Sequence, residues 1–293
     1  MRVLVVDNPR SGQGDARLYS FVRELVAAGA EVVCRPMPPG PPPPPLLGDA
    51  ASFDRVVAGG GDGTASSLAY ALRGTGAPIL AYPAGTANLL ALNLALPWDP
   101  AALASITLEG KSLQADLGEL TVGGREPIGF AIMAGAGFDA KVMEGAADLK
   151  STLGVGAYFL SVMGNLAPTV ADFRIWLDGD LLATDGIAVI IVNFAKIQFD
   201  LAVTHTSDAT DGLLEVAVIR TRSAVGLIPA VWQALLDRLG NMPERAGLEI
   251  HSAREIRVES DPALPLQHDG EVAGATTPFS ARVLPGAAVF LVP

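Results

Sequence analysis

The segment 59–64, Gly-Gly-Gly-Asp-Gly-Thr, combines glycines with a carboxylate and a hydroxyl at one turn of the chain. The apolar residues 53–58 before it predict a short buried strand, and residues 65–73 after it have apolar positions at helical spacing. A strand, a glycine turn and a helix together point backbone N–H groups at an anion such as a phosphate. Asp62 would repel a bare phosphate, so it favours a phosphate that carries a divalent cation. The alternative is a plain turn in which Asp62 and Thr64 cap the helix.

Two further predicted strands, 2–7 and 78–82, end in loops of similar composition. Ligands of open α/β sheets bind outside the carboxyl ends of the strands, so the three loops together predict one nucleotide site. Each loop alone is compatible with ordinary turn chemistry. The predicted nucleotide-binding residues are Asn8, Pro9, Arg10, Ser11, Gly12, Gly60, Gly61, Asp62, Gly63, Thr64, Thr86 and Asn88.

A pair of acids, Asp269 and Glu271, flanks Gly270 late in the chain. On an extended chain these acids would share a face, and competition between their charges would raise one pKa into the range of a general base. The alternative is a β-turn with two solvated acids. His268 adjoins the pair, and we interpret it as a bystander.

A second group of acids lies in the segment 207–213, which contains Asp208 and Asp211. Clustered carboxylates, a glycine for a tight turn and free carbonyls suit a hard cation. On spacing alone, however, a polar loop before a strand is the favoured interpretation.

The elements that must position these residues change character near residue 116. Up to about Leu113, strands and helices alternate, which predicts a parallel sheet covered on both faces. From Leu117 onward strand patterns dominate, with helical stretches only at 158–166 and 224–239, which predicts an antiparallel, sandwich-like domain. We therefore expect an α/β protein in which residues 1–116 form a three-layer α/β nucleotide-binding domain and residues 117–293 a β-rich domain. The strands expected in the second domain are 128–133, 173–177, 187–193, 214–219, 255–259, 281–284 and 288–292.

The length, cysteine content and net charge of the chain exclude several classes of protein and partner. The 293 residues are enough for two domains, and no apolar run approaches the roughly 20 residues of a membrane span. A single cysteine, Cys34, excludes an intramolecular disulfide and, with no secretory leader pattern after Met1, predicts a cytoplasmic protein. The net charge of −11 argues against nucleic acid as a partner and against electrostatic anchoring to an anionic membrane.

The ordered motifs of the chain resemble those of the diacylglycerol kinase and sphingosine kinase lipid-kinase family, over nearly the whole length. The motifs that carry the resemblance are Asn-Pro-x-Ser-Gly at 8–12, Gly-Gly-Asp-Gly-Thr at 60–64, Pro-x-Gly-Thr-x-Asn at 83–88, Gly-x-Gly-Phe-Asp at 135–139, Asp-Gly-x-Leu at 211–214 and Asp-Gly-Glu at 269–271. The resemblance implies a kinase that uses ATP and Mg²⁺ on a lipid or lipid-like alcohol of the diacylglycerol, sphingoid or phosphatidylglycerol class. It allows transient contact with a membrane surface and an oligomeric assembly.

The resemblance also implies residue roles. The site would lie in the cleft between the domains, and the C-terminal segment would return toward the first domain. Glu271 would accept the proton with Asp269 in support, and Asp62 would act at the phosphates. A structural magnesium would bind Asp208, Asp211 and the carbonyl oxygen of Leu213.

Three departures from the family pattern keep other interpretations open. Gln13 stands where many relatives have a basic residue, Ser67 where they have a glutamate, and residues 194–200 replace a glycine-rich segment. These changes fall near the predicted triphosphate and acceptor positions. The alternatives are an NAD kinase, which also uses Gly-Gly-Asp-Gly-Thr, and a catalytically degenerate nucleotide-binding sensor.

Overall fold

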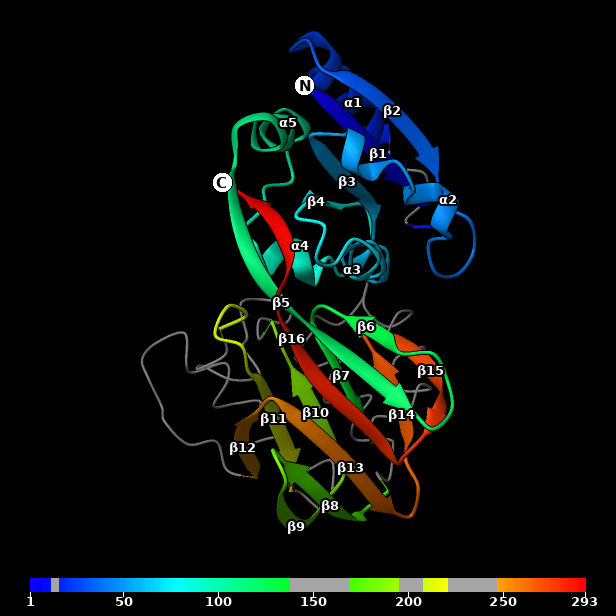
Figure 1. The fold of residues 1–293 in the computed structure, drawn as a ribbon, viewed down its shortest axis with the longest axis vertical. Helices are drawn as coiled ribbons and strands as arrows, with labels where there is room; N and C mark the ends of the chain where they lie inside the picture. Colours follow the sequence, from blue (N-terminus) through cyan, green and yellow to red (C-terminus); the bar gives the residue numbers. More distant parts are fainter. Residues whose placement is uncertain (12–15, 138–168, 195–207, 221–246) are drawn as a thin grey trace, which may run out of the picture.

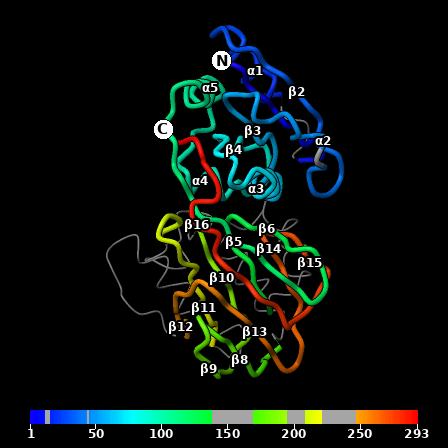
Figure 2. The backbone as a smooth tube through the Cα atoms, viewed as in Figure 1, coloured from blue at the N-terminus to red at the C-terminus, as the bar shows by residue number. Residues whose placement is uncertain are grey.

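The computed structural model describes residues 1–11, 16–137, 169–194, 208–220 and 247–293, and it separates into an α/β domain and a β-rich domain (Figure 1). The helices expected at 158–166 and 224–239 lie outside the described residues. Two long strands run between the domains, as the backbone trace shows (Figure 2). None of the helices in the described part of the chain is long and apolar enough to span a membrane.

The first domain is built on a parallel sheet with the order β2-β1-β3-β4. The interior residues of β1 and β3 are buried without alternation, as expected for strands covered on both faces. The strands are β1 (Arg2–Asp7), β2 (Glu31–Pro36), β3 (Arg55–Gly60) and β4 (Pro78–Pro83).

Helices cover the two faces of this sheet. The connection from β1 to β2 and that from β3 to β4 run in opposite directions along the sheet, so right-handed crossovers place α1 and α3 on opposite faces. Helix α5 packs against α1. The predicted three-layer α/β arrangement is therefore confirmed. The helices are α1 (Ala16–Ala27), α2 (Pro44–Leu47), the 3₁₀ turn η1 (Ala50–Ser52), α3 (Asp62–Ala71), α4 (Leu89–Asn93) and α5 (Pro100–Glu109).

The second domain packs two largely antiparallel sheets over a shared apolar core that includes Phe130, Phe173, Val216 and Leu266, which confirms the sandwich-like prediction. One sheet has the order β12-β11-β10-β7-β14-β15. The strands are β5 (Lys111–Val122), β6 (Ile128–Phe130), β7 (Met133–Ala136), β8 (Ala171–Leu177), β9 (Asp180–Gly186), β10 (Ala188–Val192), β11 (Leu214–Ile219), β12 (Leu248–Ala253), β13 (Glu255–Asp261), β14 (Pro265–His268), β15 (Glu271–Thr276) and β16 (Phe279–Val292).

Strand β16 joins the domains into one continuous sheet. Its first half pairs with β13, and its last residues lie parallel beside β4, with Val289 opposite Pro78. Strand β5 runs antiparallel to β16 along most of its length, so the chain crosses between the domains twice. The carboxyl ends of β1, β3 and β4, with α3 and α4, thus face the second domain (Figure 1).

Candidate active site

The loops after β1 and β3 are tied together by side chains that the sequence singled out. Asn8 donates from Nδ2 to the Thr64 hydroxyl at 2.9 Å, and the Ser11 hydroxyl accepts the Gly61 N–H at 3.2 Å. Asn8 Oδ1 also accepts the Arg10 N–H at 3.2 Å. These polar side chains therefore shape the two loops around one point at the edge of the sheet. Gly12 and Gln13 lie outside the described residues.

The loop after β4 packs against the glycine turn. A methyl group on Gly85 would collide with the Cα atom of Gly61, so only a glycine fits here. Asn88 is buried and holds the turn by accepting the Gly85 N–H at 2.8 Å and donating to its carbonyl at 2.7 Å. The Asn88 amide thus shapes its own loop, whereas Thr86 in the same loop is exposed.

Asp62 links α3 to α4. Its Oδ1 accepts the Leu90 N–H at 2.8 Å, so the carboxylate satisfies a free amide at the start of α4. Burial raises the pKa of Asp62, and hydrogen bonds from the amides of residues 88–90 oppose that rise. Asp62 therefore does cap a helix, but that helix is α4 and not α3, which begins at Asp62.

The two late acids do not share a face, and the expectation of an extended segment was wrong. Asp269 and Gly270 both have positive φ angles, 43° and 82°, and they form the two-residue turn of the β14–β15 hairpin, in which His268 pairs with Glu271. Asp-Gly is a preferred sequence for this turn because both central positions require positive φ. The turn therefore leaves the Asp269 carboxylate buried in the second domain and the Glu271 carboxylate at the surface.

Asp269 is buried and fully engaged by the main chain. Its Oδ2 accepts the Ala131 N–H at 2.8 Å, and its Oδ1 accepts the N–H groups of Ile132 and Met133, each at 2.9 Å. Burial raises the pKa of Asp269, and the hydrogen bonds from these three amides oppose the rise. A carboxylate held in this way organises the start of β7.

Glu271 is exposed and lies against the glycine turn of the first domain. A methyl group placed on Gly63 would collide with Oε1 of Glu271. The acid of the hairpin and the start of α3 thus meet across the domain boundary. The structure brings the loops after β1, β3 and β4 together with Glu271, while Asp208, Asp211 and Leu213 belong to a separate loop.

That separate loop, 208–213, is shaped by local turns and by a residue that the sequence did not single out. Oδ1 of Asp208 accepts the Thr210 N–H at 3.0 Å, and Oδ1 of Asp211 accepts the Leu213 N–H at 2.9 Å. Carboxylate and carbonyl oxygens are the ligand types that a hard cation such as Mg²⁺ takes, but here Oδ1 of each aspartate accepts a hydrogen bond from its own loop. Within the described ranges, no cluster of three or more His, Cys, Asp or Glu residues is suited to a metal ion.

The residue that braces this loop is Asp116, a buried acid on β5. Its two oxygens accept the N–H groups of Gly212 and Gly286, each at 2.7 Å, and its own N–H donates to the Ala209 carbonyl at 2.7 Å. Its carbonyl accepts the Asn193 side-chain amide at 2.9 Å. The sequence signal was weak, an acid between Ala115 and Leu117 in a strand of mixed composition, and a buried acid requires hydrogen-bond partners.

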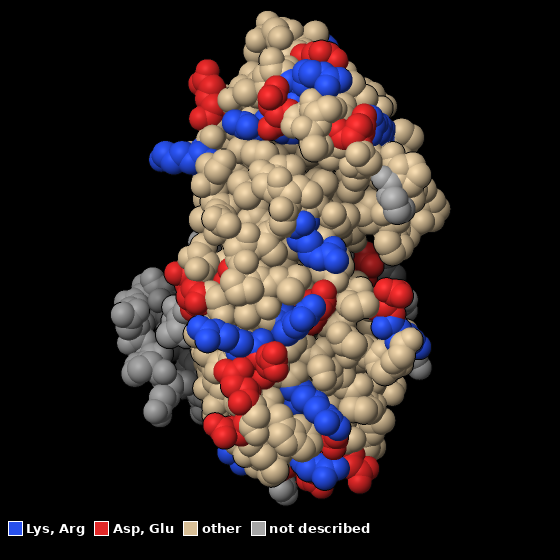
Figure 3. All heavy atoms as spheres, in the orientation of Figure 1, with Lys and Arg blue, Asp and Glu red and all other residues tan. Residues whose placement is uncertain are grey.

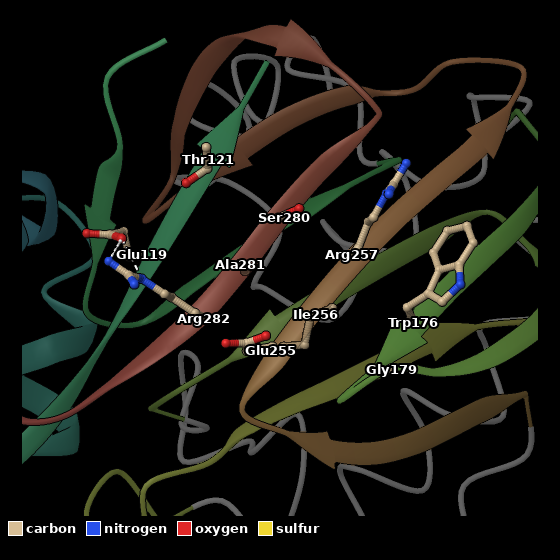
Figure 4. A pocket seen from close by; sticks show the side chains of 10 residues that line it. All are labelled: Glu119, Thr121, Trp176, Gly179, Glu255, Ile256, Arg257, Ser280, Ala281 and Arg282. Atoms are coloured by element: carbon tan, nitrogen blue, oxygen red, sulfur yellow. Dashed lines mark hydrogen bonds and ion pairs between the residues drawn. The ribbon is translucent and has the colours of Figure 1, made fainter. Parts of the chain in front are cut away.

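A hollow of about 320 Å³ lies elsewhere, on the outer face of β16, β13 and β8 (Figure 4). Its lining includes Glu119, Trp176, Arg257 and Arg282 but none of the residues of the three loops. Cationic and anionic side chains lie side by side over this face of the second domain (Figure 3). Arg257, for example, pairs with Glu259 at 2.6 Å. The hollow is therefore separate from the candidate active site.

The fold and the three strand-end loops define a two-domain kinase-like protein, and the comparisons with known proteins agree. Residues 2–120 match the family described as "Diacylglycerol kinase catalytic domain", and residues 132–292 match the "YegS C-terminal NAD kinase beta sandwich-like domain". The chain belongs to the diacylglycerol kinase catalytic domain family. It is accordingly a phosphotransferase with an alcohol group as acceptor.

Individual relatives support this assignment. The chain is 27% identical to a protein named "Diacylglycerol kinase" of Mycobacterium tuberculosis, with 100% of this chain and 95% of the relative covered. It is 30% identical to a "Probable lipid kinase YegS-like" of Chromohalobacter salexigens, covering 93% and 88%. With an uncharacterized protein of Synechocystis it shares 31% identity, and it covers 54% of that protein's length. A solved diacylglycerol kinase structure from Bacillus anthracis has the same fold, with a TM-score of 0.73, 21% identity and coverage of 100% and 97%.

Proposed function

We propose that this protein is an ATP- and Mg²⁺-dependent kinase that phosphorylates a hydroxyl of a lipid or lipid-like alcohol. The observation that supports this most is the approach of Glu271 to Gly63, because it puts an exposed acid of the second domain beside the turn predicted to hold phosphates. A kinase needs a positioned base beside the bound nucleotide, and the remaining work is orientation and charge stabilisation.

In the proposed reaction the acceptor hydroxyl attacks the γ-phosphorus of ATP. A new P–O bond forms as the bond to the ADP oxygen breaks, and the hydroxyl proton passes to Glu271. Asp62, at the start of α3, would act at the phosphates, and the amides of the glycine turn would bind them. Asp208, Asp211 and the Leu213 carbonyl would hold a structural cation. Mg²⁺, when bound, would spread the negative charge of the transferring group.

The test is phosphoryl transfer from radiolabelled Mg-ATP to a panel of acceptors in mixed micelles. The panel contains a diacylglycerol, a sphingoid base, ceramide and phosphatidylglycerol, with E271Q as the matched control. We expect transfer to one acceptor class, and much less with the variant. Absence of transfer to every acceptor, together with absence of ATP binding by calorimetry, would overturn the proposal.

The panel also includes NAD, because the C-terminal match carries NAD kinase in its description. Formation of NADP would support the NAD kinase alternative. Tight ATP binding without transfer to any acceptor, unaffected by E271Q, would instead support the nucleotide-binding sensor.

A further inference from the structure

Helix α3 presents one stripe of residues to the second domain. Gly63, Ser66 and Tyr70 are spaced i, i+3 and i+7, so they lie on the same face of the helix. Two of them contact an acid of the second domain directly. Gly63 meets Glu271, while Ser66 is buried between the two contacts. The second contact is at the far end of the stripe.

Tyr70 makes that second contact with a hydrogen bond. Its hydroxyl donates to Glu119 Oε2 at 2.5 Å, from the first domain to strand β5. Arg282 on β16 donates from Nε to the other oxygen of Glu119 at 2.7 Å (Figure 4). Both carboxylate oxygens therefore have partners. Hydrogen bonds to an ionised carboxylate are about twice as strong as neutral ones. Glu119 thereby binds α3 to the two strands that cross between the domains.

The ring of Tyr70 is fixed as well. A methyl group on Gly129 of β6 would collide with this ring, so the ring lies directly on the β6 backbone. The Arg73 guanidinium covers the ring at 4.0 Å from its centroid. Burial and the neighbouring Glu119 raise the pKa of Tyr70 to about 12, so the phenol remains a donor at neutral pH.

We propose that Tyr70 is a positioning residue, which holds α3 in one register against the second domain and thereby keeps the phosphate turn at Gly63 aligned with Glu271. Tyr70 lies seven positions after Gly63 on the helix, roughly 10 Å along the axis, so a tilt at the Tyr70 end moves the phosphate turn. Gly63 has no side chain with which to hold Glu271. This inference rests on the proposed function, because alignment matters most for transfer.

The test compares Y70F, which keeps the ring and removes the donor, with Y19F. Tyr19 is 75% exposed on α1 and is a matched control. We expect Y70F to lower kcat about 10–100-fold, the scale of a misplacement of about 1 Å, with less than a threefold change in KM for ATP, because the loops that would bind ATP lie within the first domain. Y19F should match the wild type. Full kcat in Y70F, or a loss confined to KM, would overturn the proposal.

Hydrogen exchange on the same proteins separates this inference from the proposed function. We expect faster exchange in the segment 62–71 of Y70F than in the wild type or Y19F. If the wild type transfers phosphate to no acceptor, the proposed function fails, and unchanged exchange in Y70F overturns the positioning role independently. E119A removes the acceptor of the Tyr70 hydrogen bond and should also give faster exchange in the segment 62–71. If Y70F folds poorly, E119A provides the test: faster exchange in this segment supports the positioning role, and unchanged exchange overturns it.

Discussion

Gly63, the second residue of α3, and Glu271, the first residue of β15, meet so closely across the domain boundary that a methyl group on the glycine would collide with the carboxylate where it now lies. The same hairpin buries Asp269 under three backbone amides. One of the two late acids is therefore available to a substrate and the other is part of the scaffold. Substitution of Glu271 should therefore lower activity, whereas substitution of Asp269 should lower stability.

Glu271→Gln should lower kcat by about 10²–10⁴-fold, the usual cost of removing a general base. Its free energy of unfolding should stay within about 0.5 kcal/mol of the wild type, because the side chain is exposed. Asp269→Asn should instead lose about 1–3 kcal/mol, because a buried amide group would face backbone donors. Urea unfolding and initial rates on both variants check this. A stable D269N variant with a rate loss equal to that of E271Q would contradict the assignment.

Gly63→Ala should push the Glu271 carboxylate away from the phosphate turn. We expect a fall in kcat of about tenfold or more, the usual direction for a misplaced catalytic group, and little loss of stability because the displaced atom is the end of a flexible side chain. Gly123→Ala is the matched control, since a methyl group there meets no atom within 4 Å. Equal rates in the two variants would show that Glu271 is not the base.

Asp62→Ala should reduce both stability and turnover, since Asp62 accepts the Leu90 N–H at the start of α4. We expect a loss of about 1 kcal/mol in the free energy of unfolding, the typical value of a helix cap. Asp99→Ala removes an ordinary cap, the bond from the Ala102 N–H at the start of α5, and should cost similar stability without the loss of turnover. If D62A retained wild-type turnover, Asp62 would have no part beyond capping.

Local patterns predicted the first domain and its loops because strand ends, glycine turns and helices are encoded by neighbouring residues. Asn8, Gly61 and Asp62 lie where the spacing placed them. The turn at 269–270 is also encoded locally, because Asp-Gly favours positive φ at both positions. The extended segment that the sequence analysis expects for Asp269 and Glu271 overlooks this signal. Strands β14 and β15, on either side of this turn, are not among the strands that the sequence predicted.

Contacts between distant segments could not be predicted from local patterns. Asp116 braces the loop 208–213, and Tyr70 binds Glu119, yet neither pairing leaves a periodic signal in the chain. Both pairings arise only when β5 and β16 run together between the domains. The family resemblance supplied Glu271, but the closeness of Glu271 to Gly63 is a property of the folded chain alone.

The stability of the protein in acid should report the Glu119 contacts. Burial alone would raise the pKa of Glu119, but hydrogen bonds from Tyr70 and Arg282 lower it below its ordinary value of 4.5. A depressed folded-state pKa means that the ionised carboxylate stabilises the fold above about pH 4.5, and that this contribution is lost as the pH falls through the lower folded-state value. Glu119→Gln has no proton to bind, so the difference in unfolding free energy between wild type and E119Q should be constant above about pH 5.5 and shrink below pH 4.5. Urea unfolding between pH 3 and 7 measures this difference, with Glu255→Gln on the exposed part of β13 as the control. A difference between wild type and E119Q that stays constant down to pH 3 would show that Glu119 is not held as a carboxylate by Tyr70 and Arg282.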